Sequence, residues 1–319
     1  MPKNPYVRWF ENIRLNDIPK VGGKNASLGE LYSMLAAEGI RVPEGFAVTA
    51  GAYSDTLAEA SVEGKLRQLL SGFDHRDVAV LAERAAAARQ LVYEATDNPE
   101  LRAEIAAAYR ALEEKCGANF AVAVRSSATA EDLPTASFAG QHDSFLNVRG
   151  EIDLIEACRR CFASIFTDRA IVYRIDNGFD HFKVALSVGV MKMVRSDLAA
   201  SGVVFTLDTE SGFRDVVFVT GAWGFGENVV QGKVDLDEFY VHKPTFRQGY
   251  RAALSRSLGK KEMRLVYARG DGETSTRNVP TPRAARERFC LADAEVLALA
   301  ESSSSLTNSN GKSLGSQGP

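Results

Sequence analysis

The hydrophobic pattern of this chain changes character near residue 190, and this change constrains the fold more than any other feature. Before it, apolar residues recur mostly at helical spacing, in residues 25–38, 78–115 and 152–176. After it, apolar runs rich in β-branched residues are broken by glycine and aspartate, in residues 184–194, 201–208 and 215–224. Helices with a few strands, followed mostly by strands, predict an α+β protein of two lobes.

Shorter signals refine the helical half. The segment 78–115 is expected to form two helices, separated near Asp97-Asn98-Pro99. Residues 120–124 form a short apolar run that predicts a buried strand, and a second strand is expected at the end of 137–148. The predicted helix at 152–176 has an apolar face made of Ile152, Ile155, Phe162, Ile165 and Phe166.

We expect two lobes followed by a tail. The first lobe covers residues 1–190 and the second covers 191–300, with a boundary that is uncertain by about ten residues. Residues 301–319 contain seven serines and three glycines. Such a segment buries too little apolar surface to compensate its ordering entropy, so we expect it to be disordered. Its abrupt start suggests a foreign ending, from a frameshift or a misjoined gene, with a native linker as the alternative.

Composition excludes several classes of protein. The chain has 38 Lys and Arg against 41 Asp and Glu, a net charge of −3, which argues against a dedicated nucleic-acid binder. No apolar run approaches the roughly 20 residues of a membrane span, and the N-terminus lacks the apolar core of a signal peptide. Four cysteines are too few for a disulfide scaffold. Cys158 and Cys161 could form a redox or metal pair, but no second pair or nearby histidine completes a site, so they are expected to pack inside a helix. The protein is expected to be cytoplasmic.

The basic charge is concentrated in residues 247–288, which hold eleven Lys or Arg against four acids. A surface that binds a polyanion would explain this excess. Aromatic residues for base stacking are scarce in the segment, so a solvated face is the favoured interpretation. We therefore expect no nucleic-acid partner.

The sequence Val-Gly-Gly-Lys-Asn at 21–25 precedes the first amphipathic helix. Paired glycines let the backbone approach a ligand, a helix N-terminus attracts anions, and Lys24 adds a positive charge. It is not a Walker A loop, because Ile18 and Asn25 stand where Gly and Ser/Thr are required. Either a phosphate site or a turn with a solvated lysine fits these residues.

A second candidate is the run Val-Arg-Ser-Ser-Ala-Thr-Ala-Glu-Asp at 124–132, in which Arg125 is expected to end the buried strand. The planar guanidinium of arginine suits phosphate oxygens. The small residues at 137–141 are expected to form a loop whose N–H groups close over phosphates. The alternative is a Ser/Thr-rich connection without a ligand.

A third candidate is the glycine-containing stretch 221–232, which is not a dinucleotide fingerprint because Val229 stands where its third glycine belongs. Glu227 in this stretch could face a metal or a ribose, or cap the next helix. The four histidines are scattered, and there is no H-E-x-x-H, G-x-S-x-G, H-R-D or D-F-G motif. Zinc-protease, serine-hydrolase and protein-kinase functions are therefore not supported.

Taken together, these motifs and several others resemble the nucleotide-binding region of the phosphoenolpyruvate synthase (pyruvate, water dikinase) family, which is related to pyruvate, phosphate dikinase and rifampin phosphotransferase. The resemblance covers roughly residues 7–299. Its motifs are residues 21–31, 42–49, 124–141, 194–206, 224–232 and 237–244.

The resemblance implies an ATP-grasp fold with ATP between two lobes. In that family ATP, pyruvate and water give AMP, phosphoenolpyruvate and phosphate, through a phosphohistidine on another domain. Lys24 and Arg125 would contact the phosphates and serve catalysis, while Gly140 and Ser144 would lie in the covering loop. The backbone of Met193 and Val194 would meet the adenine. Mg²⁺ would accompany ATP, and the full-length family is expected to form homo-oligomers.

The chain also departs from the family pattern. The D-I-E-W strand and Q-A-R-P segment, which supply the Glu and Gln that hold Mg²⁺, are absent, so we assign no metal ligand. Met191 stands where relatives often have Gln. The phosphohistidine motif and the pyruvate-binding barrel are absent as well, so we expect a truncated synthase that is inactive alone. The alternative function is a non-catalytic nucleotide-binding module.

Overall fold

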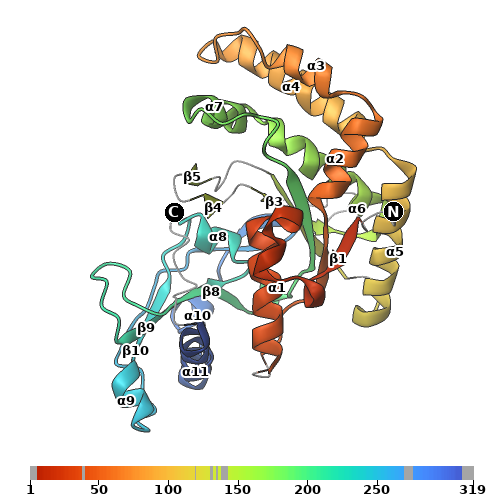
Figure 1. Cartoon of the computed structure of the whole chain (residues 1–319). Helices are drawn as coiled ribbons and strands as arrows, with labels where there is room; N and C mark the ends of the chain where they lie inside the picture. The colour runs from red at the N-terminus through yellow and green to blue at the C-terminus, as the bar shows by residue number, and fades with distance from the viewer. Residues whose placement is uncertain are drawn as a thin grey trace. The chain divides into compact units, whose positions relative to one another are not determined.

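The computed structural model describes residues 6–37, 40–118, 120–129, 132–133, 136–137, 143–268 and 276–310. Their contacts divide the chain into two compact units. Unit 1 contains the described residues up to Ala37 and those from Arg41 to Met193, and unit 2 contains Ile40 and the described residues from Val194 onward. Both units combine helices with antiparallel sheets, as the α+β prediction requires (Figure 1).

Unit 1 is built on a five-stranded antiparallel sheet in the order β1-β2-β7-β3-β6. Its strands are β1 (Val7–Trp9), β2 (Gly45–Val48), β7 (Leu186–Lys192), β3 (Val122–Ala128) and β6 (Ser144–Val148). A separate two-residue pair joins β4 (Asp132–Leu133) to β5 (Ala136–Ser137). Strands β7 and β3 carry apolar residues at alternate positions, so one face of each strand can pack in the main core.

Helices pack on both faces of this sheet. Residues of α2, α4, α5, α6 and α7 join Val122, Val124 and Val188 in the main hydrophobic core, whereas α1 packs with Ala47 on the opposite face. The helices are α1 (Ile18–Ala37), α2 (Ala50–Glu59), α3 (Glu63–Leu69), α4 (Val78–Ala95), α5 (Pro99–Cys116), α6 (Gly150–Ala163) and α7 (Asp168–Asp176). None of the helices in the described part of the chain is long and apolar enough to cross a membrane.

The predicted division of residues 78–115 is confirmed. The side chain of Asn98 accepts hydrogen bonds from the N–H groups of Glu100 and Leu101, at 2.9 and 3.0 Å, and Pro99 is the first helical residue of α5. Asparagine before proline is a strong local start signal. This boundary could therefore be predicted without tertiary information.

The single helix expected at 152–176 is wrong in two respects. The chain leaves α6 through a 3-10 turn at Ser164–Phe166, and α7 begins afresh where Thr167 caps the N–H of Ala170. Ile152, expected on the buried face, is 84% exposed. Both cysteines of the predicted buried pair, Cys158 and Cys161, are fully buried in the main core.

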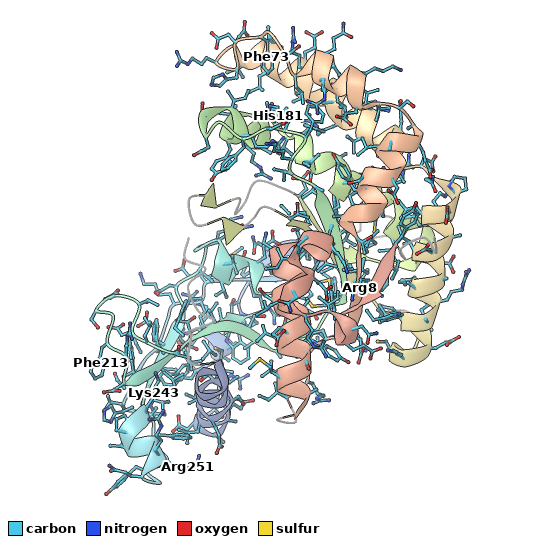
Figure 2. All side chains as sticks on the ribbon, in the orientation of Figure 1. Arg8, Phe73, His181, Phe213, Lys243 and Arg251 are labelled. Carbon is cyan, nitrogen blue, oxygen red and sulfur yellow. The ribbon has the colours of Figure 1, made fainter. Side chains whose placement is uncertain are left out.

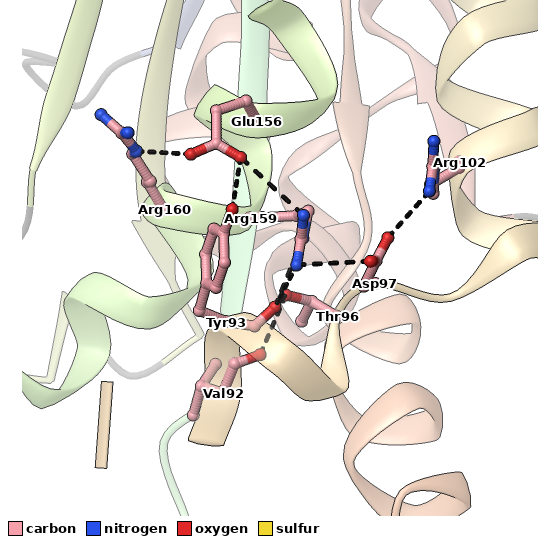
Figure 3. Close-up of polar contacts among 8 residues, drawn as sticks. All are labelled: Val92, Tyr93, Thr96, Asp97, Arg102, Glu156, Arg159 and Arg160. Atoms are coloured by element: carbon pink, nitrogen blue, oxygen red, sulfur yellow. Dashed lines mark hydrogen bonds and ion pairs between the residues drawn. The ribbon is translucent and has the colours of Figure 1, made fainter. Parts of the chain in front are cut away.

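A polar network ties α6 to the end of α4 (Figure 3). The guanidinium of Arg159 donates two hydrogen bonds to the carbonyl of Tyr93 and forms an ion pair with Asp97 at 3.7 Å. Glu156 accepts a hydrogen bond from the Tyr93 hydroxyl at 2.7 Å and pairs with Arg160. Arg159 thereby satisfies the Tyr93 carbonyl in the last turn of α4, where intrahelical partners are lacking.

Unit 2 is built on a four-stranded antiparallel sheet in the order β11-β10-β9-β8. Its strands are β8 (Ala200–Phe205), β9 (Val216–Trp223), β10 (Asp237–His242) and β11 (Ser255–Ser257), and a separate hairpin pairs β12 (Met263–Tyr267) with β13 (Thr276–Pro280). The helices are α8 (Glu227–Val230), α9 (Lys243–Arg247), α10 (Arg283–Arg286) and α11 (Asp293–Asn310). Val217, Val219 and Phe239 pack under Val296 and Ala300 of α11.

The ammonium of Lys243 holds the loop between β8 and β9. It donates to the carbonyls of Thr206 and Arg214, and the loop carries Phe213 at its exposed side (Figure 2). Burial lowers the pKa of Lys243. Carbonyls in a loop lack the backbone N–H partners that they would have in a sheet, and the Lys243 ammonium supplies donors for two of them.

The expected end of ordered structure at residue 300 is wrong, because α11 continues to Asn310. The hydroxyl of Ser302 donates to the carbonyl of Ala298 at 2.9 Å, and that of Ser303 donates to Ala300 at 3.1 Å. Serine hydroxyls can satisfy carbonyls of the preceding turn, which lets a polar sequence extend a helix already anchored by apolar residues. Residues 311–319 lie outside the described part of the chain.

Candidate functional site

The start of α1 carries the predicted Val-Gly-Gly-Lys motif, and the helix is broken there. Gly22 has φ +75° and ψ 164°, a conformation that divides α1 into a first turn and a main segment. A Cβ on residue 22 would lie 2.3 Å from Ser127 Oγ and 2.4 Å from the Ser127 carbonyl oxygen. Glycine is therefore required both for its dihedral angles and for the close approach to β3.

The position of Arg125 differs from the prediction. Arg125 was expected at the end of a strand, but β3 continues to Ala128 and pairs residue for residue with β7. The pairing lets Ser126 and Ser127 alternate between the two faces, so the hydroxylated run extends the sheet. Arg125 is the exposed residue in an otherwise buried strand.

The register of the sheet shows which face Arg125 occupies. Arg125 stands opposite Gly189 on β7 and opposite Ser144 on β6. A Cβ on Gly189 would lie 2.3 Å from Asn25 Oδ1, so this is the face that α1 covers. Side chains of directly paired residues project from the same face. Arg125 therefore emerges beside the start of the main α1 segment.

The structure thus brings three predicted residues together on one face of unit 1, and we call this surface the Lys24–Arg125 face. Lys24 precedes Asn25, Arg125 is two residues before Ser127, and the N–H of Asn25 donates to Ser127 Oγ at 3.2 Å. Lys24, Arg125 and Ser144 are all exposed. Gly140, the other predicted loop residue, lies outside the described residues.

The charge of Lys24 affects the pKa of a thiol in α6. Burial raises the pKa of the Cys161 thiol far above its usual range, and Lys24 acts in the opposite direction. The Cys161 thiol also contacts the carbonyl of Asp143, the residue before Ser144, at 3.8 Å. A lysine placed near this end of the sheet suits the attraction of an anion.

The hydrogen bonds under this face have no recognisable signal in the sequence. The Asn25 side-chain amide donates to Ser187 Oγ at 3.1 Å, and Ser187 Oγ donates to the Val48 carbonyl at 2.7 Å. Asn25, Ser127 and Ser187 are buried. The motif contained Asn25 and Ser127, but only the register of β3 against β7 reveals that they meet.

The predicted adenine contact falls where unit 1 passes into unit 2. The N–H of Met193 donates to the Ala121 carbonyl at 2.8 Å, and the Val194 carbonyl accepts from the N–H of Ser196 at 2.8 Å. Val194 is 63% exposed. Met191, the residue that departs from the family pattern, packs beside Ala47 and α1.

Glu227 is the first residue of α8 in unit 2, and its carboxylate accepts a hydrogen bond from the Gln231 side chain at 3.0 Å. Within the described residues, no three His, Cys, Asp or Glu side chains are grouped so that they could hold a metal ion. Gly224, three residues before this helix, has a packing role, because a Cβ on it would lie 2.5 Å from the Leu265 carbonyl oxygen. The carboxylate is exposed, as the predicted ribose or metal contact requires.

The basic segment 247–288 contains arginines paired with acids. The ion pairs join Arg251 to Glu301, Arg256 to Asp293, Arg283 to Glu287 and Arg286 to Glu262. Lys261 is fully buried and pairs with Asp237. This pairing is consistent with a solvated surface in which the charge excess is partly neutralised.

Comparisons with known proteins agree on one family. The family model described as "Pyruvate phosphate dikinase, AMP/ATP-binding domain" matches residues 18–313. Phosphoenolpyruvate synthase of Synechocystis sp. is 51% identical over 299 residues, which are 92% of this chain and 36% of the relative. Those of Pseudomonas aeruginosa and Escherichia coli are 53% and 48% identical over 299 residues. They cover 93% of this chain in both cases, and 37% and 38% of the relatives. The chain thus spans little more than a third of the length of these relatives.

Proposed function

This chain belongs to the pyruvate phosphate dikinase AMP/ATP-binding domain family, and from this premise we propose that it binds ATP through the Lys24–Arg125 face. We propose further that it acts as the phosphoryl-donating region of an enzyme of the phosphoenolpyruvate synthase type. The overall reaction would convert ATP, pyruvate and water to AMP, phosphoenolpyruvate and phosphate.

One observation supports this proposal above the others: Lys24 and Arg125, 101 residues apart in the sequence, are both exposed and lie on segments of unit 1 that are joined by the hydrogen bond from the Asn25 N–H to Ser127 Oγ. Lysine supplies a compact charge, and arginine supplies a planar fork that matches phosphate oxygens. Phosphoryl transfer depends on positioning and charge neutralisation more than on covalent help. The two residues have the chemistry that this requires.

The remaining contacts with ATP stay predictions from the resemblance. Gly140 would belong to a loop over the phosphates. Ser144 was predicted in the same loop, but it is the first residue of β6 and pairs with Arg125, so it would contact the phosphates from the sheet. The backbone at Met193 and Val194 would meet the adenine, and Glu227 would face the ribose or metal. Since the Met193 N–H donates to Ala121 and the Val194 carbonyl accepts from Ser196, the Val194 N–H is the group we assign to the adenine. An ATP-grasp arrangement of two lobes around ATP is part of this proposal.

Apart from the alternative given for Glu227, we assign no Mg²⁺ ligand in this chain. In this proposal Mg²⁺ arrives as the counterion of ATP. When bound, it would neutralise phosphate charge in the transfer. Lys24 and Arg125 would orient the phosphates of that complex.

The family resemblance implies the rest of the reaction. A histidine on a further domain would accept the phosphoryl group and deliver it to pyruvate, and that step is a proposal about the whole enzyme. Cytoplasmic location and homo-oligomer formation also stay predictions. A nucleotide-binding module without catalysis would use the same face.

The proposal is tested by titrating the chain with ATP, ADP and AMP in the presence of Mg²⁺ by calorimetry. If the face binds phosphates, affinity should fall in the order ATP, ADP, AMP, because each step removes a charged group. Equal affinities would contradict the phosphate assignment. AMP formation after addition of a histidine-bearing domain from a relative would support the enzyme, whereas nucleotide binding without any transfer would favour the module.

A further inference from the structure

We propose that Ser127 is a positioning residue for Lys24: its hydroxyl, on β3, caps the main segment of α1 and fixes the turn that carries Lys24. The inference rests on the proposed function, since it assigns a task to a residue beneath the proposed phosphate-binding face. It concerns contacts within unit 1 alone.

The main segment of α1 has no N-cap side chain of its own. The main segment of α1 resumes after Gly22, whose φ of +75° is not helical, so Gly22 takes the N-cap position and Gly23, Lys24 and Asn25 follow as the first three helical residues. An N-cap side chain normally accepts a hydrogen bond from the second or third N–H of the helix. Glycine has no side chain to do so.

Ser127 supplies the missing acceptor from a different part of the chain. Its Oγ accepts from the N–H of Asn25, the third helical residue, at 3.2 Å. The absence of a Cβ on Gly22 makes this approach possible, since a Cβ would lie 2.3 Å from the same oxygen. Ser127 is fully buried, so water does not replace the bond.

A second attachment holds the same turn. The Asn25 side chain donates to Ser187 Oγ at 3.1 Å, and its Oδ1 fits against the bare backbone of Gly189. Asn25 is thus fixed through its N–H by β3 and through its side chain by β7. Lys24, the residue before it, is held at its backbone while its side chain stays exposed. A lysine fixed at its base loses less freedom when it binds a phosphate.

The experiment compares Ser127→Ala with Ser126→Ala in the full chain. Ser126 is the adjacent serine on the opposite face of β3, so the pair differs in the cap and not in the chemistry removed. We expect Ser127→Ala to accelerate amide exchange at Gly23–Asn25 and to weaken ATP binding about tenfold, equivalent to about 1.4 kcal/mol. Ser126→Ala should change ATP affinity by less than about twofold.

A double-mutant cycle with Lys24→Ala then separates positioning from a general structural effect. If Ser127 acts through Lys24, Ser127→Ala should change ATP affinity by less than about twofold once Lys24 is alanine. The same tenfold loss in both backgrounds, or normal ATP affinity in Ser127→Ala, would overturn the inference alone. If Lys24→Ala by itself leaves ATP affinity unchanged, the proposed function fails together with the inference.

Discussion

At the residue scale, the proposed phosphate-binding face depends on two glycines, because a Cβ atom at either position would clash with a neighbouring residue. The loop before Lys24 can touch β3 because Gly22 has no Cβ, and the Asn25 side chain can lie against β7 because Gly189 has none. Two glycines far apart in sequence thus allow the main segment of α1 to begin in contact with the sheet of unit 1. The effect of a glycine substitution on the free energy of unfolding should therefore depend on its position.

Gly22→Ala should destabilise the protein, whereas Gly64→Ala should not. Alanine at 22 would be strained at φ +75° and would clash with Ser127, so we expect a loss of more than about 1 kcal/mol in the free energy of unfolding. Gly64 lies within α3 with nothing within 4 Å of its Cβ position, so alanine there should stabilise by about 0.5–1 kcal/mol. Urea denaturation measures both. Equal effects would show that the contact at Gly22 does not form.

His181 should make the stability of the protein depend on pH below neutrality. Its Nδ1 accepts a hydrogen bond from the Nε–H of the buried Arg174 at 2.8 Å. Burial, and next the Arg174 charge, lower the pKa of His181 from 6.5 to about 4, while Asp180 acts in the opposite direction. Because the unfolded chain then takes up a proton that the folded chain does not, the free energy of unfolding should fall as the pH drops from about 6.5 to about 4.

The variant His181→Gln keeps an acceptor for Arg174 and removes the titration. Its free energy of unfolding should therefore lose less than the wild type between pH 7 and pH 4.5, as measured by urea denaturation at each pH. Parallel pH profiles for the two proteins would remove His181 from this explanation.

At the scale of secondary-structure elements, a buried ion pair joins three segments of unit 2. Lys261 Nζ donates to Asp237 Oδ1 at the start of β10 and to the Gly259 carbonyl at 2.9 Å. Asp237 Oδ2 accepts from the N–H of Cys290, ahead of α11, at 2.7 Å. Both charged side chains are fully buried, so each depends on the other for compensation.

Lys261→Met should therefore cost about 3–5 kcal/mol of unfolding free energy, because it leaves the Asp237 carboxylate buried without its cation. The neighbouring Lys260 is exposed, and Lys260→Met should stay within about 0.5 kcal/mol of wild type. Chemical denaturation followed by circular dichroism compares the two. Similar small losses in both variants would mean that the pair contributes little.

Elements with local signals could be predicted from the sequence, and those set by distant contacts could not. The boundary at Asn98-Pro99 and the strands β7, β8 and β9 follow from capping residues and apolar runs. The continuation of β3 past Arg125 depends on pairing with β7, and the break at Gly22 depends on Ser127, 105 residues away. The extension of α11 follows from apolar anchors on β9 and β10 that the serine-rich sequence does not reveal.

The candidate site was predictable in composition but not in arrangement. Lys24 and Arg125 carry the right chemistry in sequence, and the resemblance assigned both to phosphates. Their neighbours Ser127 and Ser187 carried no such signal, because a buried serine that caps another element looks like any serine in a polar run. The contacts of Asn25 with these two serines follow from the register of β3 against β7, which the spacing of residues in the sequence does not give.

At the scale of the whole molecule, two compact units, each with its own hydrophobic core and sheet, belong to a family whose relatives here are named phosphoenolpyruvate synthase. The chain spans little more than a third of their length, so ATP binding at the Lys24–Arg125 face is the part of the proposed function that the chain can perform by itself. Binding to the folded state should stabilise the chain by about 2.7 kcal/mol at a hundredfold excess of ATP over Kd.

The most direct measurement is the ATP affinity of Arg125→Ala by calorimetry, compared with wild type and with Arg102→Ala. Arg102 is an exposed arginine of α5 that pairs with Asp97 (Figure 3), so it matches the charge change away from the Lys24–Arg125 face. Loss of a hydrogen bond to a charged group predicts weaker binding by about 1.5–3 kcal/mol for Arg125→Ala and no change for Arg102→Ala. Wild-type ATP affinity in Arg125→Ala would show that Arg125 does not contact the phosphates of ATP.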